Sequence, residues 1–306
     1  MATTTKIAWC DHTFNYWIGC SRISPGCLHC YAETFEGRWK RVDWGRGQPR
    51  YLVKDHSGPW RWDRRAANEG RRRRVFTSSL SDVLDPEVDP AWRVELCEMI
   101  ERTPHLDWLI LTKRIEFAKT LFPSHWLNGS WPANAWMGTS VENQDCANTR
   151  IPELIDLPAP VKFLSAEPLL GPVDISAGIP GIDWVIVGGE SGHGARPMNP
   201  LWVRSLMEQC DTAGVAFFFK QWGAYRYSDV LTTPAGNLIL RDPELLRGKK
   251  SAILYPKRGG AAEELTNEAF FALVPGDVIG VRVGSSAPGD DLLDGQQYQT
   301  WPVSKM

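Results

Sequence analysis

The sequence predicts an α/β protein built as a partial or open parallel (β/α) barrel. Short, almost continuously apolar runs recur along the chain and end in small or polar residues, as expected for strands buried on both faces. Helix-like segments separate these runs, and this alternation is typical of βαβ units with a parallel sheet. Polar side chains follow directly after the runs, at the edge where parallel α/β proteins bind ligands.

Seven apolar runs are predicted to be strands. They are Phe14–Gly19, Val75–Ser79, Leu106–Thr112, Ala135–Val141, Val161–Ser165, Ile182–Val187 and Val215–Phe219. Two helices have clear starts, because a capping residue precedes proline at Asp89-Pro90 and at Asn199-Pro200. Gly214 is the expected end of the second helix. Cys97 and Cys210 fall within these helices and are expected to be core thiols.

The length of 306 residues allows a barrel with additions. We expect a barrel core over 1–225 with a basic insertion at about 42–73, and a C-terminal extension over 226–306 that contains a strand at Asp277–Val283. The sequence has neither a secretory signal nor an apolar run of about 20 residues that could span a membrane. A cytoplasmic location is therefore expected, where seven cysteines favour metal binding or catalysis over disulfides.

Three cysteines lie within eleven residues, after the first predicted strand. Cys20, Cys27 and Cys30 have the spacing C-x6-C-x2-C. Three thiolates this close can hold one metal centre and leave one coordination position open, which chemistry requires and which a closed structural site lacks. Gly19 and Gly26 would let the loop backbone wrap closely around such a centre.

Two kinds of metal centre fit these cysteines. A [4Fe–4S] cluster needs four donors, so three cysteines would leave one iron free to bind a small molecule. Four-coordinate zinc would need one more ligand, for which Cys10, His12 or His29 are the candidates. The sequence lacks the paired C-x2-C knuckles of common zinc sites, so the cluster is the better supported of two open interpretations.

Positive charge is concentrated in one part of the chain, although the net charge is only −2. Residues 38–74 hold thirteen Lys or Arg against four Asp or Glu, and Arg71–Arg74 form an unbroken basic run. Four tryptophans lie among these charges, namely Trp39, Trp44, Trp60 and Trp62. Such a segment can bind phosphates and stack on bases, so we expect DNA or RNA as a partner of residues 38–74. The alternative is a solvated insertion whose tryptophans pack on the domain.

Polar side chains collect at the carboxyl-terminal ends of the predicted strands. They are Ser79, Asp82, Lys113, Arg114, Ser140, Glu142, Ser165, Glu167, Glu190 and Gln221. The cysteine loop follows the first strand and therefore belongs to the same edge. One convergent site explains this placement most simply, although a single Ser or Glu at such an end can instead cap the next helix.

Several ordered motifs carry a resemblance to known families. They are Trp17–Glu33, Val75–Asp82, Leu109–Arg114, Gly138–Asn143, Ser165–Pro172, Val187–Gly192 with Ala195–Pro197, and Phe219–Gly223. The three cysteines after a first strand resemble the radical S-adenosylmethionine superfamily, which uses a partial (β/α) barrel. Most of its members have C-x3-C-x2-C, whereas this chain has six residues in the first gap and His29 before the last cysteine. The full series looks like an uncharacterised phage-associated family, often called the three-cysteine-motif family.

The resemblance implies a role for each side chain of the polar edge. Three irons of a [4Fe–4S] cluster would be bound by Cys20, Cys27 and Cys30, with S-adenosyl-L-methionine on the fourth. The cofactor contacts would come from Ser79, Asp82, Ser140, Glu142, Glu167 and Glu190. The substrate contacts would come from Lys113, Arg114, Lys220 and Gln221, of which the cations suit a carboxylate or phosphate. Alternatively, the cations and glutamates form buried ion pairs.

The resemblance therefore implies a radical S-adenosylmethionine enzyme. A one-electron reductant would supply an electron to the cluster. Cleavage of the sulfonium would then release methionine and a 5′-deoxyadenosyl radical. The basic insertion and the phage association favour a nucleic-acid base or nucleotide, modified or repaired, as the substrate. One alternative is a radical enzyme acting on a small metabolite or peptide. Another is a zinc-containing nucleic-acid-binding protein without catalysis. The oligomeric state is not predicted.

Overall fold

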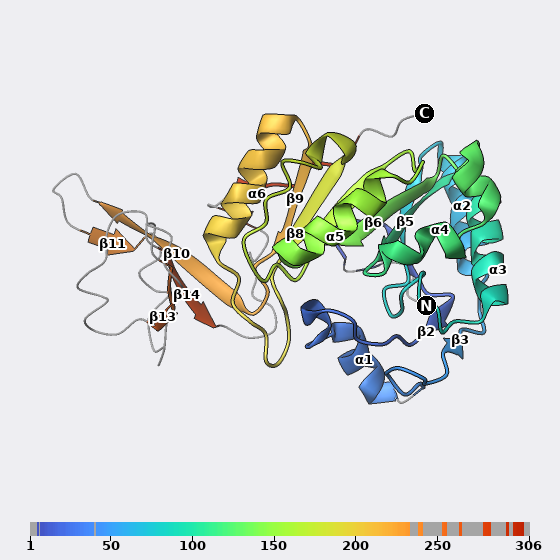
Figure 1. The fold of residues 1–306 in the computed structure, drawn as a ribbon, viewed down its shortest axis with the longest axis horizontal. Coiled ribbons are helices and arrows are strands. Elements are labelled where there is room, and N and C mark those ends of the chain that lie inside the picture. Colours follow the sequence, from blue (N-terminus) through green and yellow to red (C-terminus); the bar gives the residue numbers. More distant parts are fainter. Residues whose placement is uncertain are drawn as a thin grey trace.

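The computed structural model describes residues 5, 7–39, 41–232, 238–240, 253–255, 263–264, 278–282, 292–293 and 296–302. In these ranges the chain forms a curled parallel sheet with helices along its outer face, followed by a second, antiparallel sheet (Figure 1). The predicted α/β partial barrel is thus confirmed.

The main sheet has the strand order β1-β4-β5-β6-β7-β8-β9 in the described part of the chain, and every neighbouring pair is parallel. The strands are β1 (His12–Phe14), β4 (Arg73–Thr77), β5 (Leu106–Thr112), β6 (Ala135–Ser140), β7 (Lys162–Ala166), β8 (Trp184–Gly188) and β9 (Ala216–Gln221). Because all of these pairs are parallel, the carboxyl ends of the seven strands lie at one edge.

Helices connect the strands across the outer face. They are α2 (Gly58–Glu69), α3 (Pro90–Glu101), α4 (Ala118–Leu121), α5 (Gln144–Ile155) and α6 (Pro200–Ala213). The two predicted starts are confirmed, since the Asp89 carboxylate accepts from Ala91 N at 2.9 Å and the Asn199 side chain accepts from Leu201 N at 2.9 Å. Gly214 ends α6 with a φ of 69°.

Successive residues of the strands from β4 to β9 pack into two different hydrophobic clusters. In β5, Trp108 and Ile110 pack with the helices, together with the predicted core thiols Cys97 and Cys210. Leu109 instead joins a second cluster, which fills the inner face of the half-barrel. Its other buried members are Trp9, Phe76, Trp136, Val161, Phe163, Trp184, Ile186 and Phe218. This inner cluster forms a solid floor beneath the carboxyl edge.

The first strand differs from the predicted Phe14–Gly19. The parallel strand β1 ends at Phe14, and the next residues form β2 (Trp17–Ile18), which pairs antiparallel with β3 (Tyr51–Leu52). The side chain of Asn15 explains the break, because its Oδ1 accepts from Leu80 N at 2.7 Å. This side-chain contact lies at the break, and beyond it Gly19 again bridges Ser81 in parallel.

The predicted insertion contains a regular element of the barrel. Helix α2 lies within residues 42–73 and packs on β4 and β5, with Trp62 and Ala66 buried. It is therefore the crossover helix between β1 and β4. The additional parts of this connection are α1 (Tyr31–Trp39) and β3, and in Figure 1 α1 lies apart from the outer helices. For Trp62, packing on the domain is thus the correct alternative.

The second sheet follows the half-barrel. Its strand order is β11-β10-β14-β12-β13, and it extends away from the half-barrel beside α6 (Figure 1). The strands after β9 are β10 (Tyr225–Thr232), β11 (Leu238–Leu240), β12 (Ile253–Tyr255), β13 (Glu263–Glu264), β14 (Val278–Arg282), β15 (Leu292–Leu293) and β16 (Gln296–Gln297). β14 matches the late strand candidate, whose outer residues 277 and 283 fall outside the described ranges. The division at residue 225 stays a prediction.

The C-terminal segment returns to the half-barrel and covers the edge of β9. Tyr298 O accepts from Phe219 N at 2.7 Å, and Thr300 N donates to Phe217 O at 3.1 Å. These bonds pair the backbone of an edge strand that would otherwise be open. Within the described ranges, no helix is both long and apolar enough to cross a bilayer.

Candidate metal and cofactor site

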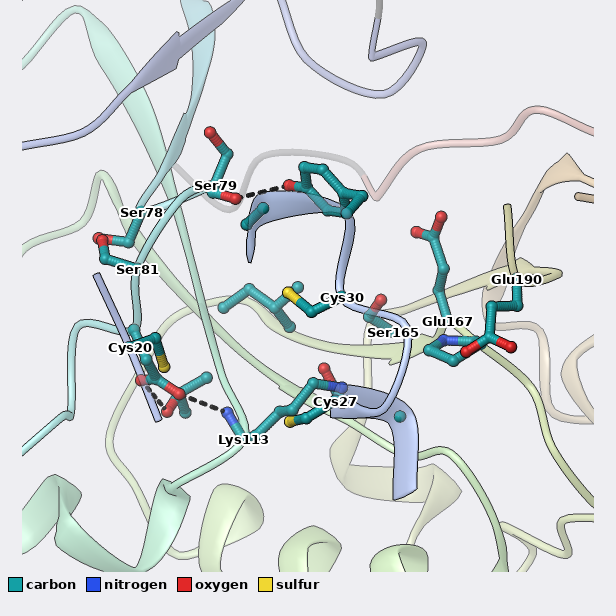
Figure 2. Close-up of a pocket in the computed structure, with 18 of the residues that line it drawn as sticks. Cys20, Cys27, Cys30, Ser78, Ser79, Ser81, Lys113, Ser165, Glu167 and Glu190 are labelled. Carbon is teal, nitrogen blue, oxygen red and sulfur yellow. Dashed lines mark hydrogen bonds between the residues drawn. The ribbon is translucent and has the colours of Figure 1, made fainter. Parts of the chain in front are cut away.

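A cavity of about 680 Å³ opens at the carboxyl edge of the main sheet. Cys20, Cys27 and Cys30 all line it, and Figure 2 shows the three side chains around one space. The predicted polar residues that line it are Ser79, Asp82, Lys113, Arg114, Ser140, Ser165, Glu167, Glu190, Lys220 and Gln221. The fold thus brings the cysteines and the polar strand ends together. Glu142 is the exception and lies behind the wall.

Burial raises the pKa of two of the cysteine thiols. Removal from water raises the pKa of Cys20 to about 12, with Asp82 adding to the effect and Arg114 opposing it. Burial also raises the pKa of Cys30. A metal ion binds thiolates, so metal binding at this loop would release protons.

Glu142 holds the cysteine loop from β6. Its carboxylate is 0% exposed and accepts from Ser24 Oγ at 2.7 Å and from Gly26 N at 2.8 Å, while Lys113 donates to it from β5. Burial alone would raise the pKa of Glu142, but the charge of Lys113 and these hydrogen bonds hold it below its usual value. A Cβ at Gly26 would lie 2.5 Å from Glu142 Cδ, so glycine is required for this close approach.

Arg114 holds the loop from the end of β5. Its Nη1 donates to Cys20 Sγ at 3.3 Å, and its Nη2 donates to Ser21 O at 2.8 Å and to Ser21 Oγ at 2.9 Å. The guanidinium pairs with Asp82 Oδ2 at 3.1 Å. The other bonds to the Asp82 carboxylate come from Leu84 N, Thr112 Oγ1 and Lys113 N. Groups of the protein itself thus occupy most of the acceptor sites of the Asp82 carboxylate.

A third group holds the loop from the segment between β8 and α6. Arg196 Nη2 donates to Pro25 O at 3.0 Å, and the same guanidinium bonds to Glu190. His29 Nδ1 lies 3.0 Å from Glu190 Oε2. Burial would raise the pKa of Glu190, but the hydrogen bonds from Arg196 and His29 hold it below its usual value. Sequence reasoning missed Arg196, because its motif lay beyond the strand end.

Two serines that the sequence analysis did not select complete the wall after β4. Ser78 and Ser81 line the cavity, and their Oγ atoms are buried without a hydrogen-bond partner in the described part of the chain. Ser78 has a φ of 63°, which is rare for a residue with a Cβ. An unpaired buried hydroxyl is costly, so both side chains have hydrogen-bonding capacity that the described residues leave unused. Ser78 could have been found from the strand alternation, which puts it on the face of Phe76.

The far wall carries an ion pair above an apolar floor. Lys220 Nζ pairs with Glu167 Oε1, and both side chains line the cavity and are about one fifth exposed. In Figure 2 Glu167 and Glu190 lie across from Cys20. Phe76 and Leu111 contribute apolar surface to the same cavity. The arrangement suits a ligand with one polar and one apolar part.

The candidates for a fourth zinc ligand are spread apart. Of the three, only His29 lines the cavity. His12 is buried and stacks on Trp62 with ring centroids 4.3 Å apart, and Cys10 Sγ lies 3.8 Å from Ile7 O. In the described ranges, no three His, Cys, Asp or Glu side chains are grouped as ligands of one metal ion.

The basic run Arg71–Arg74 lies at the opposite edge of the sheet from the cysteines, because β4 begins at Arg73. Its side chains contact the protein itself. The partners are Asp11 for Arg71, Asp107 for Arg72, Glu69 for Arg73 and the ring of Trp301 for Arg74. Trp44, from the same basic segment, lines the cavity. Binding of DNA or RNA by residues 38–74 stays a prediction, and Trp44 is its best placed aromatic side chain.

One family covers almost the whole chain. The family described as "Protein of unknown function (DUF5131)" matches residues 4–302. The protein belongs to this family. Its description gives no reaction, and the phage association expected from the motifs stays a prediction. No protein of curated function matches the chain.

Solved structures of spore photoproduct lyase are similar in part. A complex with dinucleoside spore photoproduct has 12% identity and a TM-score of 0.39, over 63% of this chain and 59% of that one. A doubly substituted mutant with bound AdoMet and dinucleoside spore photoproduct has 13% identity and a TM-score of 0.42, over 79% and 71%. A mutant with one cysteine replaced by serine has 14% identity and a TM-score of 0.39, over 87% and 71%. This chain thus spans less than two thirds of the first of these proteins.

Proposed function

We propose that this protein is a radical S-adenosylmethionine enzyme. In this proposal Cys20, Cys27 and Cys30 hold a [4Fe–4S] cluster, and S-adenosyl-L-methionine occupies the adjoining cavity. One observation carries the proposal: three thiols from a single loop line one cavity at the carboxyl edge of a parallel half-barrel. The edge position matters because ligands of parallel α/β proteins bind there.

The residues present fit both groups. Each cysteine of a cluster binds its own iron, so the sulfurs need not converge on one ion. The cavity of about 680 Å³ is within the usual range of small-molecule sites. The unpartnered hydroxyls of Ser78 and Ser81 supply donors and acceptors for a polar ligand. Together the cluster and S-adenosylmethionine supply a carbon radical that removes hydrogen from a substrate.

The chain's own part is to hold the loop rigid. Glu142, Arg114 and Arg196 fix the loop from the segments that follow three different strands through the bonds described above. These contacts occupy the Glu142 carboxylate and most of the acceptor sites of the Asp82 carboxylate. We therefore assign both side chains to positioning the loop rather than to direct cofactor contact. Ser78 and Ser81 take over the contact role, beside Ser79, Ser140, Glu167 and Glu190 as expected from the sequence.

The substrate side of the proposal is the far wall. Lys220 and Gln221 offer polar groups, while Phe76 and Leu111 offer an apolar surface. A nucleic-acid base combines a polar edge with an apolar face, and we propose a base or nucleotide as the substrate on this ground. The main alternative is a small metabolite or peptide held by the same residues. The enzyme needs a one-electron reductant, and the cluster suits a reducing compartment such as the cytoplasm.

Metal content of cysteine variants tests the proposal. Anaerobically purified and reconstituted protein is expected to be brown, with about four irons and four sulfides per chain. Cys27→Ala should lose most of this iron. Cys10→Ala should retain it, because Cys10 lies outside the cavity. A colourless protein with one zinc per chain, lost in Cys10→Ala, would instead favour the zinc-containing nucleic-acid-binding protein.

A further inference from the structure

Arg114 has an unusual position for a charged side chain. It is 3% exposed and lies at the end of β5, yet its Nη1 is 3.3 Å from the sulfur of Cys20. Its remaining bonds go to Ser21 and to Asp82. Burying a cation costs several kcal/mol unless its surroundings compensate, so a buried arginine aimed at a cysteine needs an explanation.

The bonds to Arg114 fix its direction before any metal binds. Asp82 is itself 5% exposed, and backbone N–H groups of Leu84 and Lys113 together with the Thr112 hydroxyl orient its carboxylate. The carboxylate in turn orients the guanidinium. A planar guanidinium held at several of its donors has little freedom to turn away from the sulfur. The N–H···S contact is therefore built into the fold.

The other two groups that hold the loop act differently. Glu142 bonds to Ser24 and to the backbone of Gly26, and Arg196 bonds to Pro25 O. In the described part of the chain, the hydrogen bond from Arg114 is the contact in which a charged side chain donates to one of the three cysteine sulfurs. Arg114 thus joins the general task of holding the loop to a direct electrostatic effect on one sulfur.

We propose that Arg114 raises the reduction potential of the cluster through its hydrogen bond to Cys20 Sγ, and that Asp82 limits the size of this effect. This inference rests on the proposed function, because it requires a cluster on Cys20. One-electron reduction adds negative charge to the cluster and its thiolates. A cationic donor to a ligand sulfur stabilises this charge, and hydrogen bonds to sulfur are among the factors that set cluster potentials. Asp82 partly neutralises the cation and weakens its pull.

The test is the midpoint potential of the reconstituted cluster in the full chain. It is measured in a redox titration that monitors the electron paramagnetic resonance signal of the reduced cluster. Arg114→Gln removes the charge, so the midpoint should become more negative. We expect about a tenfold change in the reduced-to-oxidised ratio at fixed potential, which is about 59 mV for one electron. Arg114→Lys keeps the charge without the planar fork and should shift the midpoint less.

Two further variants separate this effect from damage to the loop. Arg196→Gln removes a loop contact without touching a cysteine sulfur. It should change the reduced-to-oxidised ratio of the cluster at fixed potential by less than twofold. Asp82→Asn removes the counter-charge and should move the midpoint in the positive direction. A purely structural role would not produce opposite shifts for Arg114→Gln and Asp82→Asn.

The outcomes distinguish this inference from the proposed function. If the wild-type protein forms a cluster and Arg114→Gln leaves its midpoint unchanged, or shifts it no more than Arg196→Gln does, the role of Arg114 is refuted and the cluster stands. If Arg114→Gln does not hold a cluster, a negative or absent shift in Asp82→Asn refutes the role. If the wild-type protein forms no cluster, both proposals fail.

Discussion

At the residue scale, the charged side chains around the cysteines act mainly on the loop. The sequence placed Asp82, Lys113, Arg114, Glu142 and Glu190 at one edge, and their alternative role in buried ion pairs is met by several of them. Strand ends are visible in a sequence because hydrophobicity changes there. The direction in which a carboxylate turns is not visible, since it depends on donors from other strands. For the same reason Ser81, which lies beyond the end of the predicted strand, could not be distinguished from an ordinary helix-capping serine.

Glu142→Gln tests whether the Glu142 charge stabilises the fold. The substitution keeps the shape but removes the charge that Lys113, Ser24 and Gly26 contact, and we expect a loss of about 2 kcal/mol in the free energy of unfolding at neutral pH. The folded-state pKa of Glu142 is lowered, so its contribution is present above its unfolded pKa and disappears as pH falls through the folded value. Urea unfolding of both proteins should therefore show that the difference in free energy of unfolding between wild type and Glu142→Gln becomes smaller in acid.

The control for this experiment is Glu33→Gln, which removes a carboxylate paired with Arg22 on the surface. Its effect should stay within about 0.5 kcal/mol. Equal stability of Glu142→Gln and wild type at neutral pH would show that the Glu142 carboxylate is not needed to hold the loop.

Ser81→Ala tests whether the unpartnered hydroxyls face a ligand. The Oγ atom has no protein partner among the described residues, so its removal should leave the melting temperature unchanged or raise it slightly. If it contacts S-adenosylmethionine, affinity should fall about tenfold, in line with one lost hydrogen bond to a charged group. Calorimetric titration of the reconstituted proteins with S-adenosylmethionine measures the affinity of the variant and of wild type. Ser205→Ala, on the outer helix α6, is the control, and an unchanged affinity in Ser81→Ala would argue against this contact.

At the element scale, the periodic parts of the sequence were the most predictable. The strands from β4 to β9 were located within a few residues, because each is buried on both faces and reads as one apolar run. The first strand was misplaced, since Asn15 makes a side-chain bond to Leu80 N that no hydrophobic pattern records. Helix α2 was taken for part of an insertion because its exposed face is basic, although Trp62 and Ala66 pack on the sheet.

Gly138→Ala tests the packing of the central strand β6. A Cβ at Gly138 would lie 2.4 Å from the ring of Phe163 on the neighbouring strand, so this buried ring or the backbone must move. We expect a loss of about 1–3 kcal/mol in the free energy of unfolding, measured by denaturant titration. Gly37→Ala is the matched control, because nothing lies within 4 Å of the added Cβ in α1, and it should stabilise by about 0.5–1 kcal/mol. A neutral Gly138→Ala would contradict this packing.

At the scale of the whole molecule, the two edges of the half-barrel differ in character. The carboxyl edge gathers the cysteines and the cavity, while the basic run Arg71–Arg74 lies at the amino edge and contacts Asp11, Asp107, Glu69 and Trp301. The sequence revealed the concentration of charge but not its place, because the run precedes β4 instead of following it. A nucleic acid that reaches the cavity would therefore meet Trp44 rather than this run.

Trp44→Ala and Arg71→Gln together test where a nucleic acid binds. Binding of a fluorescent single-stranded oligonucleotide at several salt concentrations should weaken about tenfold in Trp44→Ala, since stacking on one base contributes about 1–3 kcal/mol. Arg71→Gln should bind nearly as well as wild type, because its guanidinium is paired with Asp11 at the other edge. The reverse pattern would move the nucleic acid to the amino edge, and no binding by wild type would remove nucleic acid as a partner.

The central claim is that three cysteines hold a cluster beside a cavity for S-adenosylmethionine. The most direct test is to mix the reduced, reconstituted protein with S-adenosylmethionine under strict exclusion of oxygen and to quantify methionine and 5′-deoxyadenosine by mass spectrometry. Wild type and Cys10→Ala are each expected to form one methionine for each 5′-deoxyadenosine. Cys27→Ala is expected to form neither product. A cluster-loaded wild-type protein that neither binds nor cleaves S-adenosylmethionine would contradict the claim.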